Sequence, residues 1–220
     1  ALPALAPLIA ANAPQLLMLQ EADRPPDWPA DAVGCAVPGQ RWGSWLLARE
    51  GSLTPIPLPD YAGWLTGATW SNGSDSVECF SLHSPSGTDR SYVAECLRMV
   101  GLIDKKVGRS LPVVIGGDFN FKSFGRRAEG EAVANTNEEL RALDEFENLG
   151  FSIAWRATHP SAPLPQTLRW SRNPVTPYHC DGFLVRGLDI RGCEIVRTDD
   201  LGSPSDHDPV FIALAPTGAA

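Results

Sequence analysis

The sequence predicts a mixed α/β sandwich in a single domain, with helices packed on the outer faces of its sheets. Three observations support this fold class. Short apolar runs typical of strands outnumber the amphipathic repeats typical of helices. The two clearest helical repeats fall between such runs. Glycine and proline, 20 of each among 220 residues, make up nearly a fifth of the chain, against roughly 12% in average proteins. Turn formers at this frequency exclude a helical bundle, while 43% hydrophobic residues are enough to form a core.

The first part of the chain predicts one short helix followed by several short strands. Leu5, Leu8 and Ile9 share one side of a helix over residues 4–12, which Pro14 ends. Strands bounded by glycine, proline or polar residues are predicted at Leu16–Leu19, Val33–Val37, Trp45–Ala48, Gly67–Trp70 and Val77–Ser84.

The middle of the chain contains the two clearest helices. Apolar residues at three- and four-residue spacing predict a helix over 89–108, which Thr88 or Asp89 can cap. A second helix over about 137–149 begins at a capping box, formed by Thr136 and the glutamate three residues later. The remaining strands are predicted at Val113–Ile115, Thr167–Trp170, Asp181–Val185, Glu194–Arg197 and Val210–Leu214.

Composition excludes several classes of protein. A formal net charge of −8 disfavours a protein that binds nucleic acid through bulk positive charge, although a local basic site remains compatible with it. The five cysteines lack the spacing of zinc or redox motifs, which indicates buried free thiols. A serine hydrolase is excluded because no G-x-S-x-G occurs. No apolar run approaches the ~18 residues of a transmembrane helix.

Polar side chains follow several of the predicted apolar strands at the point where each strand ends. Glu21 and His83 follow two of them, and Asp118 and Asn120 follow the strand that ends at Ile115. Asp206–Asp208 precedes the last strand. Because ligands of α/β proteins gather at strand ends, we expect these residues to form one site.

The same residues carry a resemblance to a known family. Five strings are similar, in order, to motifs of the endonuclease/exonuclease/phosphatase superfamily, which includes DNase I: Leu19-Gln20-Glu21, Leu82-His83-Ser84-Pro85, Gly116-Gly117-Asp118-Phe119-Asn120, Tyr178-His179-Cys180-Asp181-Gly182-Phe183 and Ser205-Asp206-His207-Asp208-Pro209-Val210. The resemblance covers residues 15–214, and Gly-Asp-Phe-Asn and Ser-Asp-His-Asp-Pro-Val are its most specific parts. It implies a four-layer α/β/β/α sandwich of two mixed sheets and a metal-dependent hydrolase of phosphate esters.

The resemblance also implies roles for the carboxylates and the amide. Glu21 would be the principal ligand of Mg²⁺ or Mn²⁺, and Asp206 the second carboxylate near the ion. Oxygen ligands suit both metals. Asp118 would orient or deprotonate the attacking water, and Asn120 would hold that water or a phosphate oxygen.

Two histidines complete the set that the resemblance implies. His207 would contact the scissile phosphate and act in acid–base catalysis, oriented by Asp181 as a carboxylate fixes an imidazole tautomer. His83 would donate to the phosphate or to the leaving oxygen.

One departure from the family pattern concerns the beginning of the sequence. Family members start with a strand that carries an asparagine upstream of the metal-binding glutamate, whereas this sequence starts inside the segment that matches the first helix. We therefore expect residues 1–220 to form one N-terminally truncated domain that lacks the first strand.

Two basic loops carry the clues to the substrate. Aromatic residues interleaved with cations suit nucleic acid through stacking and phosphate contacts, and solvated loops with buried aromatics are the alternative interpretation. The candidate substrate-binding residues are Lys122, Arg126, Arg127, Arg169, Trp170 and Arg172.

Three functions remain open at this point. The first is a phosphodiesterase or nuclease, and the second is a phosphatase of a phosphorylated small molecule or lipid headgroup. The third is a non-catalytic, degenerate member, which the missing strand motivates and the retained site residues argue against. We expect a monomer without a transmembrane segment. The compartment stays open, with the cytoplasm favoured.

Overall fold

The computed structural model describes residues 2–24, 31–73, 75–86, 90–108, 111–127, 135–173, 175–198 and 205–218, and the side chains of these residues from residue 5 onward. Its helices and strands run in the following order: α1 Leu2–Asn12, β1 Leu16–Asp23, β2 Ala32–Ala36, β3 Trp42–Ala48, β4 Ser52–Ile56, β5 Leu65–Asn72, β6 Asp75–His83, α2 Tyr92–Val107, β7 Val113–Asp118, α3 Asn137–Asn148, β8 Ser152–Ile153, α4 Ala154–Thr158, β9 Asp181–Arg186, β10 Leu188–Ile195 and β11 Val210–Pro216.

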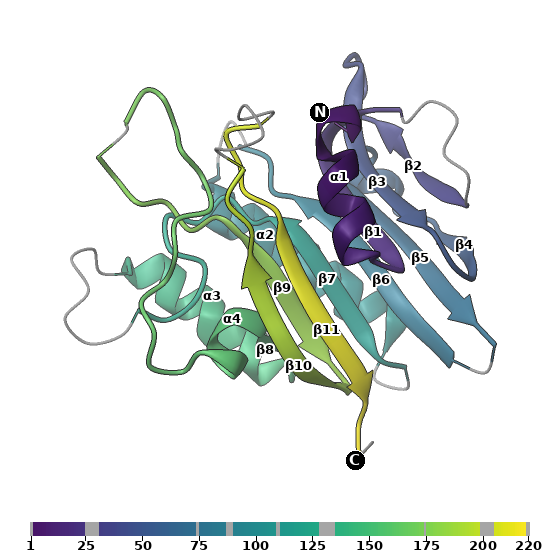
Figure 1. The fold of residues 1–220 in the computed structure, drawn as a ribbon. Helices are drawn as coiled ribbons and strands as arrows, with labels where there is room; N and C mark the ends of the chain where they lie inside the picture. Colours follow the sequence, from purple (N-terminus) through teal and green to yellow (C-terminus); the bar gives the residue numbers. More distant parts are fainter. Residues whose placement is uncertain are drawn as a thin grey trace.

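A six-stranded mixed sheet forms the centre of the molecule, in the order β4-β5-β6-β7-β9-β8. Its β6 and β7 are parallel and its other neighbours are antiparallel. Helices α2 and α3 cover one face (Figure 1). The core between them and the sheet includes the fully buried side chains of Phe80, Ile103, Ile115 and Phe146. This core fixes the positions of the strand ends, at which the candidate site residues lie.

The opposite face of the six-stranded sheet carries a second strand layer in two antiparallel pieces, β1-β3-β2 and β10-β11. Leu46 and Ala48 of β3 pack against Ala68 and Cys79 of the central sheet. Helix α1 lies on the outer side of this layer beside β1 (Figure 1). The layers therefore run α/β/β/α, and the predicted fold class is confirmed.

Several predicted elements are confirmed with small changes at their ends. The capping box at α3 is present: Glu139 N donates to Thr136 Oγ1, and Thr136 N donates to Glu139 Oε2. Helix α1 contains Pro7 and extends to Leu2, two residues beyond its predicted start. Helix α3 was predicted correctly because apolar periodicity and a capping box coincide in it.

Other predictions need correction. Ser91 caps α2 by accepting a hydrogen bond from Ala94 N, whereas the proposed caps Thr88 and Asp89 lie outside the described residues. The strand predicted at Thr167–Trp170 is wrong: only two isolated bridges occur there, from Leu168 to Tyr178 and to His207. The backbone of this segment forms hydrogen bonds with the loops that carry Tyr178 and Asp206, and it joins no sheet.

Three short elements, β4, β8 and α4, were not predicted from the sequence, and a fourth, β10, was predicted too short. Strand β4 contains Pro55, which is tolerated because β4 lies at the sheet edge. Strand β10 begins six residues before the predicted Glu194. Buried and exposed side chains alternate only weakly along β10, because most of them are half-buried.

Two findings concern predictions made from composition. All five cysteines carry free thiols, and four of them are buried, while Cys35 is exposed. Among the described residues, no helix has the length and apolarity needed to cross a membrane.

Candidate active site

The register of the central sheet places three candidate residues in one row. Asp118 at the end of β7 pairs with His83 of β6 on one side and with Asp181 of β9 on the other. Gly117, at φ +145°, allows this approach: a Cβ there would lie 2.0 Å from the carbonyl oxygen of Leu82. The backbone at this site therefore requires glycine directly before Asp118.

His207 joins this row from the loop before β11. Its Nδ1 donates to the Asp181 carboxylate, at 2.9 Å from Oδ2 and 3.0 Å from Oδ1. Thr167 Oγ1 in turn accepts hydrogen bonds from the backbone N–H groups of Cys180 and Asp181. The predicted imidazole–carboxylate pair is therefore present, and the backbone of its carboxylate is held in place.

The charges around His207 favour its protonated form. Burial opposes the charged imidazolium, but the charge and hydrogen bond of Asp181 outweigh it, with smaller contributions from Asp118 and Asp206, and the pKa of His207 rises to about 10. His207 is accordingly protonated at neutral pH.

Asp118 experiences the opposite balance. Burial raises the pKa of Asp118 to about 8, the negative charge of Asp181 adds to this effect, and His207 and the Asn120 amide only partly offset it. Ligand atoms of Asp118, Asp181 and His207 all lie within 4.8 Å of one another. A divalent cation would stabilise the charged form of a carboxylate whose pKa is raised by burial and by a neighbouring acid, and carboxylate oxygens suit Mg²⁺ or Mn²⁺.

Glu21 and Asn120 adopt backbone conformations that are unusual for their residue types. Their φ angles are +50° and +55°, and the only other described non-glycine residue with positive φ is Ala13. The register of β1 against β3 shifts between Leu19 and Ala22, so Glu21 lies at an irregularity of the strand, of the kind that a β-bulge produces. Such strain is retained where the surroundings enforce it, often at functional sites.

His83 lies between the acidic groups and two tryptophans. Its Nε2 is 3.9 Å from Glu21 Oε1 and 3.8 Å from Asp118 Oδ2, both too long for hydrogen bonds. Burial lowers the pKa of His83 to about 4, with the charge of His207 adding to the effect. Trp64 and Trp42 pack against its ring in tilted orientations, at centroid distances of 5.0 and 5.8 Å. His83 is therefore a neutral imidazole at the site. The two tryptophans were not predicted from the sequence, because neither lies in a motif.

The two predicted metal ligands lie around the buried cluster. Glu21 and Asp206 are both exposed, and neither belongs to the compact group of Asp118, Asp181 and His207. Glu21 raises the pKa of Asp118 and Asp206 raises that of His207, so both act on the cluster electrostatically.

The candidate substrate-binding residues divide into two groups. Three have partners within the chain: Arg126 with Asp144 and Glu147, Arg127 with Ser123, and Arg169 with Asp208. Lys122, Trp170 and Arg172 are exposed.

Asp208 is a site-supporting residue to which sequence analysis gave no role. Its side chain is fully buried and accepts hydrogen bonds from Thr198 N, at 3.0 Å, and from Arg169. Arg197 Nε lies 3.4 Å from its Oδ2. Asp208 thereby fixes the loop that carries Asp206 and His207. The signal in the sequence was an acid directly before Pro209 in the most specific motif.

Comparison with known proteins identifies the fold. No protein-family model matches the sequence, and no curated protein matches it. Among solved structures, an AP endonuclease from Archaeoglobus fulgidus is 18% identical with a TM-score of 0.69, over 94% of this chain and 91% of that one. The 3′ phosphatase NExo from Neisseria, bound to a product DNA hairpin, is 19% identical with a TM-score of 0.67, over 97% and 94%.

A third solved structure is the endonuclease domain of TRAS1, a telomere-specific non-LTR retrotransposon. It is 15% identical to this chain with a TM-score of 0.67, over 96% of this chain and 89% of that one. Likeness at such low identity shows the fold, which is the endonuclease/exonuclease/phosphatase fold that the sequence resemblance implied.

Proposed function

We propose that this protein is a divalent-metal-dependent phosphodiesterase that acts on nucleic acid. The observation that carries the proposal is the pairing of His207 with Asp181, placed within 4.8 Å of the buried Asp118 carboxylate. A histidine–carboxylate pair beside a buried carboxylate provides the groups that a metal-assisted attack of water on a phosphate requires. The likeness in fold to nucleases and a DNA-bound phosphatase favours a phosphoester substrate.

The residues present fit the metal. Glu21 and Asp206 would hold it from the solvent side, with Asp118 facing it from the buried side. A bound Mg²⁺ or Mn²⁺ would supply positive charge that polarises the phosphate oxygens and offsets their repulsion of the nucleophile. The same charge would lower the pKa of Asp118 from its value of about 8, which would make its carboxylate available as a base.

The chain's own groups then divide the proton transfers. Asp118 accepts a proton from the attacking water, which the Asn120 amide, anchored through its Nδ2 to the carbonyl oxygen of Ser84, helps to position. His207, protonated at neutral pH and oriented by Asp181, donates a proton to the leaving oxygen. His83, neutral and held by Trp64, donates a hydrogen bond to a phosphate oxygen.

Nucleic acid is favoured as the substrate because of the exposed groups beside the site. Arg169 N donates to the carbonyl oxygen of Asp206, so the loop that bears Trp170 and Arg172 lies against the proposed metal ligand. Trp170 is 40% exposed and could stack on a base, while Lys122 and Arg172 could contact phosphates. A phosphatase acting on a small molecule or lipid headgroup would use the same chemistry without these contacts.

The decisive experiment measures hydrolysis of bis-p-nitrophenyl phosphate with Mg²⁺, with Mn²⁺ and with EDTA. We expect activity only with metal, and its loss in Asp118→Asn and His207→Ala. Asp189→Asn is the matched control, since Asp189 pairs with Arg191 at the surface of β10 and should leave activity unchanged. Undiminished activity in EDTA would contradict the metal requirement, and inactivity under all conditions would favour a non-catalytic module.

A substrate panel separates the two catalytic alternatives. Single-stranded DNA, duplex DNA, RNA, inositol phosphates and sphingomyelin would be compared by kcat/KM at one ionic strength. The proposal expects the highest values with nucleic acid and a steep fall with added salt. A preference for an inositol phosphate or sphingomyelin would assign the second function.

A further inference from the structure

Trp42 differs in burial from the rest of its strand. Residues 43–48 of β3 are all buried, whereas Trp42, the first residue of the strand, is only half-buried. The indoles of Trp45 and Trp70 donate to backbone carbonyl oxygens, but none of the residues that the structure describes accepts a hydrogen bond from the indole of Trp42. Trp42 therefore keeps open surface and an available N–H donor at the end of a well-packed strand.

Trp42 lies next to the candidate site. In the register of β1 against β3 it pairs with Asp23, two residues after Glu21. Its ring centroid is 5.8 Å from that of His83, whose Nε2 lies 3.8 Å from Asp118 Oδ2. A group that contacts Trp42 is therefore a direct neighbour of a phosphate held at Asp118.

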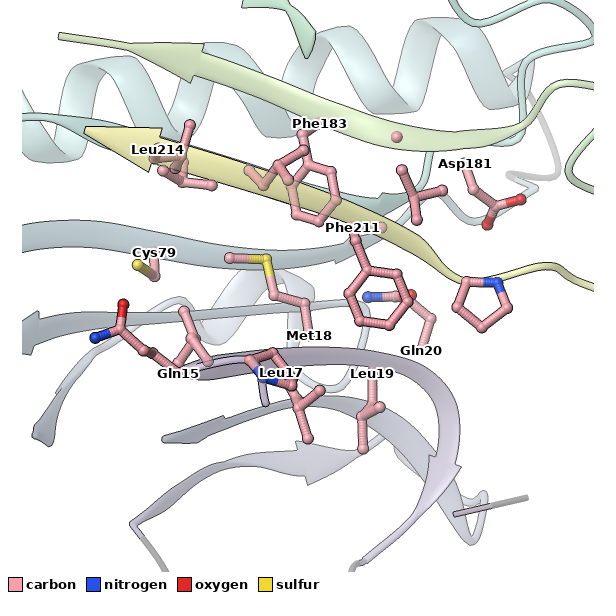
Figure 2. A pocket seen from close by; sticks show the side chains of 18 of the residues that line it. Gln15, Leu17, Met18, Leu19, Gln20, Cys79, Asp181, Phe183, Phe211 and Leu214 are labelled. Carbon is pink, nitrogen blue, oxygen red and sulfur yellow. The ribbon is translucent and has the colours of Figure 1, made fainter. Parts of the chain in front are cut away.

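Trp42 and the carboxylates of the site face a common space. Trp42, Glu21 and Asp118 line one cavity of about 1170 Å³, together with residues of β1 and β11. Figure 2 shows the interior of this cavity, with Gln20 and Asp181 toward one end. Asp181 pairs with Asp118 across β9 and β7, so the candidate site lies at this end. A ligand bound at the carboxylates can therefore reach Trp42 through the same space.

Two neighbouring rings hold the indole of Trp42. Trp64 meets it edge to face, with 5.3 Å between the centroids and 83° between the ring planes, and such a contact covers at most one face of Trp42. Trp64 is anchored in turn, because its carbonyl oxygen accepts hydrogen bonds from His83 N and from Ser44 Oγ. A ring that is already held in place loses little conformational freedom when a ligand stacks on it.

The surroundings of Trp42 favour a nucleobase as its ligand. Every nucleobase has a flat π-face that stacks on tryptophan, whatever its hydrogen-bonding pattern. Arg24 is exposed and lines the same cavity, so a cation is near for an adjacent phosphate. An aliphatic lipid chain or a saturated sugar ring has no flat aromatic face to place against the indole.

The position of Trp42 further favours a base that is unpaired. A base inside a duplex has both faces covered by its neighbours, so it must leave the stack before it can contact an aromatic side chain beside the reacting phosphate. Leaving the stack costs free energy in a duplex and much less in a single strand. An aromatic ring this close to His83 therefore discriminates between the two forms of nucleic acid.

We propose that Trp42, held by Trp64, is a stacking subsite for the unpaired base next to the scissile phosphate and directs the enzyme to single-stranded nucleic acid. The inference rests on the proposed function, which it extends from nucleic acid in general to single strands. Trp170 belongs to the loop that lies against Asp206, so it contacts a different nucleotide.

The test couples Trp42 to one base. Single-stranded DNA of about ten nucleotides, within the range of known single-strand sites, carries one abasic position that is moved along the strand. Binding is measured in Ca²⁺, without turnover, and compared with a duplex of the same sequence. Trp42→Leu removes the ring and Trp42→Phe keeps a smaller one. Trp70→Leu is the matched control, since Trp70 is also half-buried but donates its N–H to a backbone carbonyl oxygen.

The expected result is specific to one position of the strand. Trp42→Leu should weaken binding of the intact strand about 5- to 150-fold and binding of the duplex much less. With the base removed at one particular position, the loss should largely disappear. Trp42→Phe should retain most of the affinity, and Trp70→Leu should leave the ratio between intact and abasic strands unchanged. The slope of log K against log salt should be the same in Trp42→Leu as in wild type, because no phosphate contact is lost.

Three outcomes would overturn the proposal: the same loss in Trp42→Leu with the intact strand and with every abasic strand, an equal loss with the duplex, or no binding of single strands by the wild type. Because binding is measured without turnover, these outcomes are separate from the proposed function. Hydrolysis of nucleic acid without coupling between Trp42 and a base would remove the subsite alone. Coupling in a protein that hydrolyses no phosphodiester would support the subsite and contradict the proposed function.

Discussion

His207 and Asp181 form the best-defined pair of the candidate site, with 2.9 Å between Nδ1 and Oδ2. They come from different elements: Asp181 opens β9, and His207 lies in the loop before β11, where it forms a bridge with Leu168. A carboxylate on Nδ1 fixes the tautomer and the orientation of the ring. The pair therefore couples the central sheet to the last strand and sets the protonation state of the proposed acid.

The first prediction removes the charge of this pair. Asp181→Asn should reduce kcat by about 10²- to 10⁴-fold, because the amide neither raises the pKa of His207 nor fixes its tautomer. The pKa of His207 should fall from about 10 toward 6.5, so the remaining activity should be lost at lower pH on the alkaline side of the profile. A pH–rate profile with a metal-saturated enzyme measures this. The double variant with His207→Ala should be no worse than His207→Ala alone, and additive losses would show that the residues act separately.

The second prediction separates activity from stability at Asp118. Asp118→Asn should abolish hydrolysis yet stabilise the metal-free protein by roughly 1–3 kcal/mol above pH 8, because burial disfavours the charged carboxylate. The pKa of Asp118 is about 8 in the folded state, against 3.8 for an unperturbed aspartate, so the folded state binds more protons and wild-type stability falls as pH rises through this range. Urea unfolding in EDTA at pH 5 and pH 9 measures the difference. A variant that is less stable than wild type at pH 9 would contradict this account.

The sequence predicted the parts of the site that have short-range causes. Glycines before Asp118 and an apolar strand before them were enough to place that carboxylate at a sheet end, and the family resemblance implied Asp181 as the partner of His207. The capping box of α3 was predicted for the same reason, since both of its residues lie within one turn.

What the sequence did not predict depends on contacts between distant segments. Trp42 and Trp64 surround His83 only because β3 and the turn before β5 meet there. Arg169 is similar: its position among aromatics and cations indicated substrate binding, but its guanidinium bonds to the buried Asp208, 39 residues away. The strand predicted around it was wrong for the same reason, because its backbone bonds to loops instead of a sheet.

The third prediction tests the role of Arg169. Arg169→Ala should lower the free energy of unfolding by roughly 1–3 kcal/mol, since Asp208 is fully buried and would keep, among the described residues, Arg197 and Thr198 as partners of its side chain. Urea unfolding with far-UV circular dichroism measures the loss. If Arg169→Ala instead left stability unchanged and raised KM alone, Arg169 would be a substrate contact.

The fourth prediction concerns the exposed cation of the same loop. Arg172→Ala should leave the free energy of unfolding within about 0.5 kcal/mol of wild type, because Arg172 is exposed. If it contacts a phosphate of duplex DNA, the slope of log K against log salt should become shallower by about 0.9. Binding to labelled DNA in Ca²⁺ at several salt concentrations measures the slope. An unchanged slope would remove Arg172 from the proposed interface.

The fifth prediction uses a histidine outside the proposed machinery. His179 is 1% exposed, and burial lowers its pKa to about 4 against 6.5 for a free side chain, even though its Nδ1 lies 2.7 Å from the carbonyl oxygen of Pro165. Between these two values the unfolded chain binds the proton and the folded chain does not, so stability is full above pH 6.5 and falls as pH drops toward 4. The loss from this group should reach roughly 2–3 kcal/mol at pH 4.

His179→Gln, which keeps a donor for Pro165, should show a smaller difference in unfolding free energy between pH 7.5 and pH 4.5 than wild type. The comparison is made within each variant, so a general loss of stability in His179→Gln does not affect it. Equal differences in the two proteins would show that His179 is protonated in the folded state at pH 4.5.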